Sequence, residues 1–111
     1  MNTVCLRFYA REGEQHRARL IHDYLLEQAK TFGASGATVM RASAGFGRHG
    51  WHETTFFELG GDLPVVIEII LAATLAEKML ALCAAEQLHL FYTLMPVTMG
   101  ITGSGPVHES D

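Results

Sequence analysis

Clustered positive charge is missing from this sequence, which holds 8 Lys and Arg residues against 12 Asp and Glu residues and has no basic run. A nucleic-acid surface needs clustered cations to neutralise phosphates, so the composition argues against nucleic-acid binding. All basic side chains except Lys78 lie within residues 1–48. Any anion-binding site is therefore expected to be small, local and built around arginines of the first half.

Cysteine is almost absent as well, because only Cys5 and Cys83 occur, far apart and outside any C-x-x-C pattern. Such spacing favours neither a zinc site nor a redox dithiol. Both residues are interpreted as small hydrophobic side chains.

Long apolar runs are also lacking. The most apolar stretch, Leu63 to Ala73, contains Glu68 and is too short to span a bilayer. The N-terminus has no basic region followed by an apolar stretch, which a secretory signal would show. We therefore expect a soluble, cytoplasmic protein.

Apolar side chains are nevertheless sufficient for one packed core, since 49% of the 111 residues are hydrophobic and 18% are charged. This length fits one domain. We expect that domain to occupy residues 1–100, followed by a flexible C-terminal tail of small and polar residues over 101–111.

The first half of the chain alternates between two hydrophobic periods. Residues 3–10 follow a period of two, which predicts a strand. Apolar residues from Ala18 to Phe32 then recur at helical spacing, and Gly33 and Gly36 follow where helices commonly end. His16 and His22 are placed on the surface of this helix. A second strand is predicted over 37–42.

The second half repeats this order. Pro64 opens a β-branched third strand over 65–70, apolar on both faces as expected in the middle of a sheet. Thr74 and Glu77 have the spacing of a capping box, which predicts the start of a second helix. Residues 88–99 are predicted as a fourth strand. The order strand, helix, strand, strand, helix, strand is typical of the ferredoxin-like α+β fold, a four-stranded antiparallel sheet with both helices on one face.

The helix-free face of such a sheet would be mostly apolar. Its first and third strands are expected to be neighbours, which would bring Arg7 close to Glu68 and form an ion pair. Large exposed apolar patches are typical of interfaces, so we predict self-association through this face. The residues expected there are Cys5, Arg7, Tyr9, Val66, Glu68 and Ile70.

The glycine-rich segment Gly45 to Gly50 is the strongest candidate for ligand chemistry. Glycines let backbone N–H groups approach an anion, and Arg48 can donate two hydrogen bonds to a phosphate or carboxylate. The alternative is a flexible loop, continuing to Gly61, in which the glycines only serve turns. Spacing alone leaves both interpretations open.

Three segments in this order resemble the middle of the PII signalling proteins: residues 36–39, the run Gly45-Phe46-Gly47-Arg48, and residues 63–69. The similarity is greater still to a compact, poorly characterised PII-like branch. It implies a homotrimer with an adenine-nucleotide cleft between neighbouring subunits. The ligand-binding positions it implies are Gly36, Thr38, Gly45, Phe46, Gly47 and Arg48.

Two departures from the PII pattern bear on the ligand. PII proteins carry a glycine- and lysine-rich phosphate loop between the second helix and the fourth strand, whereas residues 86–92 have neither glycine nor lysine. Because that loop is missing, we expect the ligand to carry a mono- or diphosphate rather than a triphosphate. His49 replaces the PII glutamine that helps to bind 2-oxoglutarate with magnesium.

Histidines and aromatic residues also occur in the long loop. His49, His52 and Glu53 offer ligands for zinc, copper or nickel, but two ligands at one close spacing are a weak signal, and solvated loop histidines are the alternative. Trp51, Phe56 and Phe57 would either insert into a partner or pack on the trimer itself. No metal site or cofactor is assigned.

The sequence thus favours a sensor over an enzyme, because neither cysteine lies in an exposed, electropositive setting and no acid–base group stands out. The predicted function is a trimeric regulatory protein that binds a small anionic metabolite, such as an adenine nucleotide, and contacts a partner protein through its loop. The alternatives are a ligand-free trimeric module that binds a membrane transporter, and a metal-binding protein that uses His49, His52 and Glu53.

Overall fold

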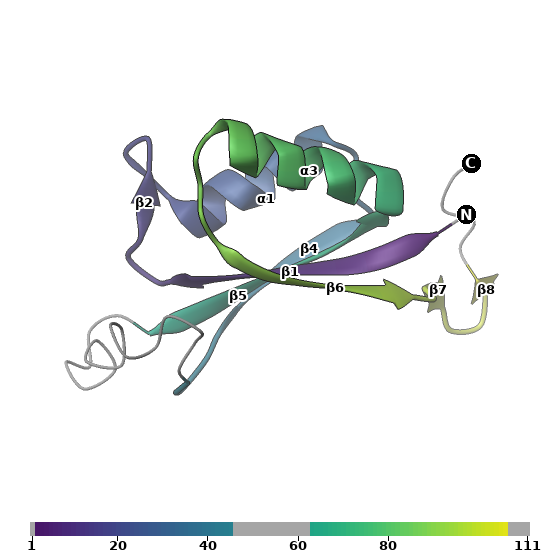
Figure 1. The fold of residues 1–111 in the computed structure, drawn as a ribbon. Coiled ribbons are helices and arrows are strands. Elements are labelled where there is room, and N and C mark those ends of the chain that lie inside the picture. The colour runs from purple at the N-terminus through teal and green to yellow at the C-terminus, as the bar shows by residue number, and fades with distance from the viewer. Residues whose placement is uncertain (1, 46–62, 107–111) are drawn as a thin grey trace.

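The computed structural model describes residues 2–45 and 63–106, and within them it has the predicted ferredoxin-like α+β fold. Figure 1 shows two helices lying on one face of a four-stranded antiparallel sheet, whose strand order is β4-β5-β1-β6. The elements of these two layers are β1 (Thr3–Arg11), α1 (Ile21–Thr31), β4 (Gly36–Arg41), β5 (Pro64–Ala72), α3 (Ala73–Ala85) and β6 (Phe91–Val97).

The two central strands form the core because every second residue on each is apolar. Leu6 and Phe8 on β1 and Ile67 and Ile69 on β5 are at most 1% exposed. They pack under apolar residues of both helices, including Leu25, which is fully buried. The period-two pattern of β1 and the central position of β5 are therefore confirmed.

Helix α1 ends at the predicted glycine. Gly33 has φ +81°, a left-handed conformation that glycine adopts without steric cost. The N–H of Gly33 donates to the carbonyl of Lys30, and the N–H of Ala34 donates to that of Ala29. These two hydrogen bonds are those of a Schellman motif, which satisfies the last carbonyls of the helix.

The start of α3 differs from the prediction. Strand β5 continues to Ala72, which precedes the helix without a side-chain capping hydrogen bond, so Thr74 lies inside the first turn. The chain passes from strand to helix with no intervening loop. The N–H of Ala73 instead donates to the carbonyl of Asn2 at 2.9 Å. A backbone group distant in sequence therefore takes part of the role assigned to the capping box.

A small hairpin precedes α1 where the sequence predicted the first helical turn. Strands β2 (Gln15–His16) and β3 (Arg19–Leu20) pair antiparallel across a tight turn at Arg17 and Ala18. The predicted start of the helix at Ala18 and the placement of His16 on the helix surface are therefore wrong. The helical spacing was accidental there, because Ala18 has φ +63° and cannot belong to a helix.

The fourth strand is shorter than predicted, since residues 88–90 lead into β6 without belonging to it. Beyond β6, β7 (Gly100–Ile101) and β8 (Gly105–Pro106) form a second small hairpin. A tail over 101–111 remains a prediction, and most of the loop predicted between Gly45 and Gly61 lies outside the described residues. Within the described ranges, no helix is long and apolar enough to cross a membrane.

Candidate functional site

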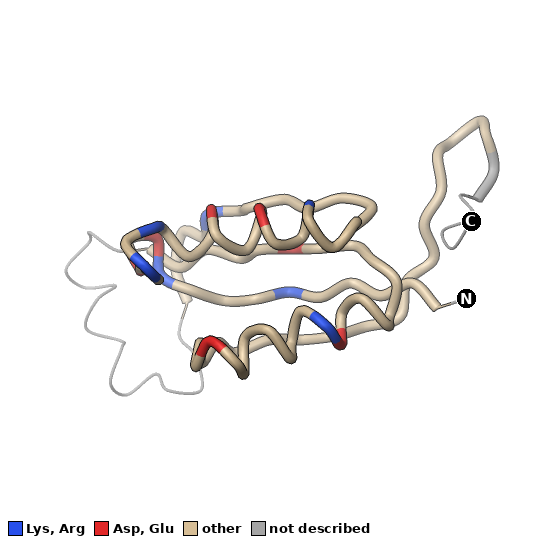
Figure 2. Tube along the Cα trace, turned by 90° about the horizontal axis from the view of Figure 1, so that it is seen from above, with Lys and Arg blue, Asp and Glu red and all other residues tan. Residues whose placement is uncertain are grey.

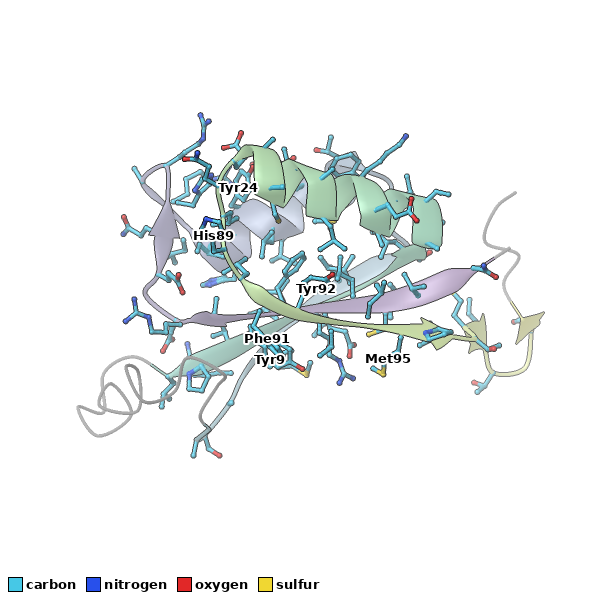
Figure 3. The ribbon with its side chains drawn as sticks, viewed as in Figure 1. Tyr9, Tyr24, His89, Phe91, Tyr92 and Met95 are labelled. Carbon is cyan, nitrogen blue, oxygen red and sulfur yellow. The ribbon has the colours of Figure 1, made fainter. Side chains whose placement is uncertain are left out.

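The face of the sheet opposite the helices is rich in exposed apolar side chains. Met40 on β4 and Phe91 and Met95 on β6 are 41%, 42% and 38% exposed. The rings of Tyr9 and Phe91 pack with centroids 5.5 Å apart. Figure 3 shows Tyr9, Phe91 and Met95 together on the side of the sheet away from the helices. The described chain therefore leaves a broad apolar face in contact with solvent.

A charged pair lies at the centre of this open face. Arg7 and Glu68 are opposite one another in the β1–β5 register, as the sequence predicted. Glu68 Oε2 accepts a hydrogen bond from Arg7 Nε at 2.9 Å and forms an ion pair with Arg7 Nη2 at 2.8 Å. Thr38 and Thr93 complete the row, opposite Glu68 and Arg7. Arg7 and Glu68 are thus paired with each other, and apolar side chains surround this row.

Cys5 lies beside this pair but is not a candidate nucleophile. The residue is 2% exposed. Burial raises the pKa of the Cys5 thiol, and the nearby Glu68 carboxylate raises it further. A nucleophilic cysteine needs the opposite environment, in which neighbouring cations stabilise the thiolate.

Three of the six predicted ligand-binding residues lie in described segments. Gly36 and Thr38 belong to the edge strand β4, and both are exposed. A Cβ atom built on Gly36 would meet nothing within 4 Å, and one built on Gly45 would meet only Pro64 Cγ at 3.9 Å. Packing within the described chain therefore does not explain these two glycines, which leaves room for another molecule to approach the backbone.

The other three residues, Phe46, Gly47 and Arg48, lie outside the described residues, as do His49, His52 and Glu53. The structure therefore does not test whether Arg48 joins Gly36, Thr38 and Gly45. Residues 2–45 and 63–106 hold no group of three His, Cys, Asp or Glu side chains that could bind a metal ion.

The ends of β4 and β5 are held together beside Gly45, which the sequence did not reveal. Arg41 forms an ion pair with Glu12, and the N–H of Glu12 donates to the carbonyl of Leu63 at 2.8 Å. The N–H of Ala42 donates to the carbonyl of Pro64 at 2.9 Å. No local pattern around Glu12 indicates this contact, because it depends on a strand pairing between distant parts of the sequence.

A groove of about 650 Å³ lies on the helix side of β6. Helix α1 packs over β4 and β5, and α3 packs over β5 and β1, so the edge strand β6 is poorly covered. Tyr92 and Leu94 on this side are each 45% exposed. Figure 3 shows Tyr92 on the helix side, opposite to Phe91. The groove contains none of the predicted ligand-binding residues; it is lined by Phe8, Leu80, Cys83, Ala84, Leu88, His89, Leu90, Phe91 and Tyr92.

Comparison with known proteins gives one family and one fold. The DUF190 family model, described as "Uncharacterized ACR, COG1993", matches residues 3–99. A UPF0166 protein from Aquifex aeolicus (strain VF5) is 44% identical over 66 residues, which cover 59% of this chain and 63% of the relative. A UPF0166 protein from Methanocaldococcus jannaschii is 37% identical over 65 residues, which cover 59% of this chain and 60% of the relative. The matches thus span less than two thirds of either relative.

A solved structure also has a similar fold. The crystal structure of a protein from Thermus thermophilus, described as a PII-like signaling protein, aligns with a TM-score of 0.50 and 22% sequence identity. The alignment covers 87% of this chain and 90% of that one. At this identity the similarity concerns the fold.

Proposed function

Because the chain belongs to the DUF190 family, which its sequence matches over residues 3–99, we propose that it is a PII-like regulatory protein that works as a cytoplasmic homotrimer. It would bind a small anionic metabolite between subunits and contact a partner protein. The fold shared with the Thermus thermophilus protein supports a regulatory role. Under this proposal the chain is a sensor and not an enzyme.

The open face of the sheet is the observation that carries the proposal. Its apolar side chains include Met40, Phe91 and Met95, each more than a third exposed in the single chain. Contiguous apolar surfaces of this kind are typical of protein interfaces. The charges of Arg7 and Glu68 are paired with each other, so a second subunit could cover them without leaving a charge unpaired.

The proposed ligand site lies at the exposed edge of β4 and the segment that follows it. Gly36 and Gly45 are open to a neighbouring molecule, and Thr38 supplies a hydroxyl on the same edge strand. Together with Phe46, Gly47 and Arg48, these residues would surround an adenine nucleotide or a similar anion. A mono- or diphosphate is favoured, because residues 86–92 contain no lysine or arginine.

Light scattering and calorimetry test the two parts separately. Light scattering at micromolar concentration should give the mass of a trimer, and a stable monomer would refute the assembly. Calorimetry with AMP, ADP and ATP should then detect binding to the trimer. Arg48→Ala should cost about 1.5–3 kcal/mol of binding free energy if Arg48 makes a charged hydrogen bond to the ligand. Arg19→Ala is the control, because Arg19 lies away from β4 and is engaged with Glu27.

A trimer that binds no nucleotide or dicarboxylate would favour the second candidate, a ligand-free module that binds a membrane transporter. The apolar face supports this candidate equally well, because the face is evidence for assembly of subunits and not for binding of a ligand. Binding of zinc, copper or nickel that is lost on replacing His49 and His52 would favour the metal-binding alternative.

A further inference from the structure

The β2–β3 hairpin brings two nitrogen-bearing side chains to the C-terminal end of α3. His16 Nε2 lies 3.0 Å from Glu86 Oε1, and Arg17 Nε donates to the same oxygen at 2.7 Å. Glu86 is the C-cap residue of α3. Figure 2 shows acidic and basic positions gathered at this end of the molecule. One carboxylate oxygen thus joins two elements that are distant in sequence.

The turn of the hairpin has an unfavourable backbone conformation. Arg17 and Ala18 have φ values of +53° and +63°, which are costly for any residue except glycine. Such conformations persist where surrounding contacts hold them, and they are often found at functional sites. The contacts of Arg17 and its neighbour His16 with Glu86 help to hold this turn, together with the pairing of β2 and β3.

The two side chains differ in how much freedom they retain. The side chain of His16 is 15% exposed, and its ring packs edge-on against Tyr24 with centroids 4.9 Å apart. The side chain of Arg17 is 69% exposed and binds Glu86 through Nε. Within the described residues, no partner is found for its two terminal nitrogens. A guanidinium with free terminal N–H groups is well suited to bind an oxyanion.

Glu86 itself behaves as a bound anion. Hydrogen bonds from His16 and Arg17 hold the pKa of the Glu86 carboxyl below its ordinary value of 4.5, so the group is ionised at neutral pH. The position of Glu86 at the C-terminal end of α3 opposes its ionisation, because the helix dipole disfavours negative charge there. The carboxylate is therefore bound by the hairpin but is poorly placed relative to its own helix.

We propose that His16 and Arg17 form a binding site for a phosphate monoester group, and that the Glu86 carboxylate occupies this site until the phosphate displaces it. A phosphate monoester carries about −1.5 to −2 charge at neutral pH, more than the single charge of the carboxylate, so it can compete for the Arg17 guanidinium and the neighbouring His16 ring. Displacement frees the hairpin from the end of α3. The inference is independent of the proposed function, since none of these residues belongs to the proposed intersubunit site.

Binding of inorganic phosphate to the full chain, followed by NMR at constant ionic strength, tests the proposal. The side-chain Nε–H signal of Arg17 should shift saturably with phosphate. Arg17→Ala should weaken binding about tenfold or more, because a charged hydrogen bond is lost. Glu86→Gln should strengthen binding about threefold or more, because the competing charge is removed. Arg19→Ala is the matched control, since Arg19 belongs to the same hairpin but binds Glu27.

Unchanged or weaker phosphate binding in Glu86→Gln would overturn the proposal and leave the contact as a purely structural one. Unchanged binding in Arg17→Ala, or no response in either the natural chain or Glu86→Gln, would overturn it as well. Arg17→Lys keeps the charge without the forked donors and should bind phosphate less tightly while its melting temperature confirms folding. Loss of nucleotide binding in Arg48→Ala with an intact phosphate response would bear on the intersubunit site alone.

Discussion

At the residue scale, Glu68 tests whether the central ion pair is covered by another subunit. Glu68→Lys would place two cations side by side, because Arg7 lies directly opposite in the strand register. We expect the variant to shift the dissociation of the trimer to at least about tenfold higher protein concentration, since an unpaired charge in an interface is costly. Light scattering over a dilution series measures this shift.

Glu77→Lys makes the same charge change on the exposed surface of α3 and serves as the control. It should leave the assembly unchanged. Equal effects of the two substitutions would attribute the loss to net charge and not to the open face.

Glu86 gives a pH dependence whose sign follows from its environment. Hydrogen bonds from His16 and Arg17 lower the pKa of this carboxyl from 4.5 in the folded chain. A lowered folded pKa stabilises the protein above the unfolded value, and this contribution is lost as the pH falls through the folded pKa. The free energy of unfolding should therefore fall more steeply below about pH 4.5 in the natural chain than in Glu86→Gln.

Urea unfolding of both proteins across this acidic range provides the measurement. Parallel curves would show that Glu86 has the same pKa in the folded and unfolded chains.

At the element scale, the two helices end in the same way with different residues. Each ends in a left-handed residue, which is Gly33 after α1 and Gln87, with φ +56°, after α3. The hydrogen bonds after α3 have the same pattern, from Gln87 to Ala84 and from Leu88 to Cys83. Only the glycine adopts this conformation without steric cost.

Gly33→Ala should therefore lower the free energy of unfolding by about 1 kcal/mol, because alanine is strained at φ +81°. The matched control is Gly36→Ala, where no positive φ is required and nothing lies within 4 Å of the new Cβ. That substitution should change stability by less than about 0.5 kcal/mol. Thermal or urea unfolding compares the two variants.

Gln87→Gly makes the opposite test at the end of α3. The substitution relieves the left-handed strain of glutamine but makes the unfolded chain more flexible. We expect a net gain of about 0.5 kcal/mol in the free energy of unfolding. A loss of stability would mean that the glutamine side chain makes contacts that outweigh its backbone strain.

At the scale of the whole molecule, strand β6 allows the two faces of the sheet to be compared. Phe91 and Met95 lie on the open face, whereas Tyr92 and Leu94 lie on the helix side, and all four are 38–45% exposed. If the open face is the trimer interface, the double substitution of Phe91 and Met95 by serine should dissociate the trimer. The same double substitution of Tyr92 and Leu94 should leave it assembled.

Light scattering reports the mass of both variants, and circular dichroism confirms that each remains folded. Dissociation by the Tyr92 and Leu94 variant alone would move the interface to the groove beside α3. Because both pairs lie on the same strand and are similarly exposed, general loss of hydrophobic surface is controlled.

Much of the fold follows from local patterns in the sequence. The alternation along β1, the apolar residues of β5 and the glycine after α1 each predicted an element whose cause is local. The Arg7–Glu68 pair was predicted as well, because the order of elements determines which strands are neighbours. The similarity to a poorly characterised family, based on segments in residues 36–69, is confirmed by the DUF190 match over residues 3–99, and the predicted fold is shared with the Thermus thermophilus protein.

Other features depend on contacts between segments that no local pattern connects. The first residue of α3 donates a hydrogen bond to Asn2. The spacing of Ala18 predicted a helix, but the structure has a hairpin turn there, whose Arg17 binds Glu86. For the candidate ligand site, sequence similarity named six residues, and the structure places only Gly36, Thr38 and Gly45.

The sequence by itself therefore determined the four long strands, the two helices, their order and the apolar faces of the sheet, because hydrophobic period and backbone preference act over a few residues. Only the tertiary structure decided that β6 is poorly covered by the helices, that Arg41 reaches Glu12, and that His16 and Arg17 share one carboxylate oxygen. Each of these depends on the path of the whole chain, which sets which distant side chains lie within hydrogen-bonding distance.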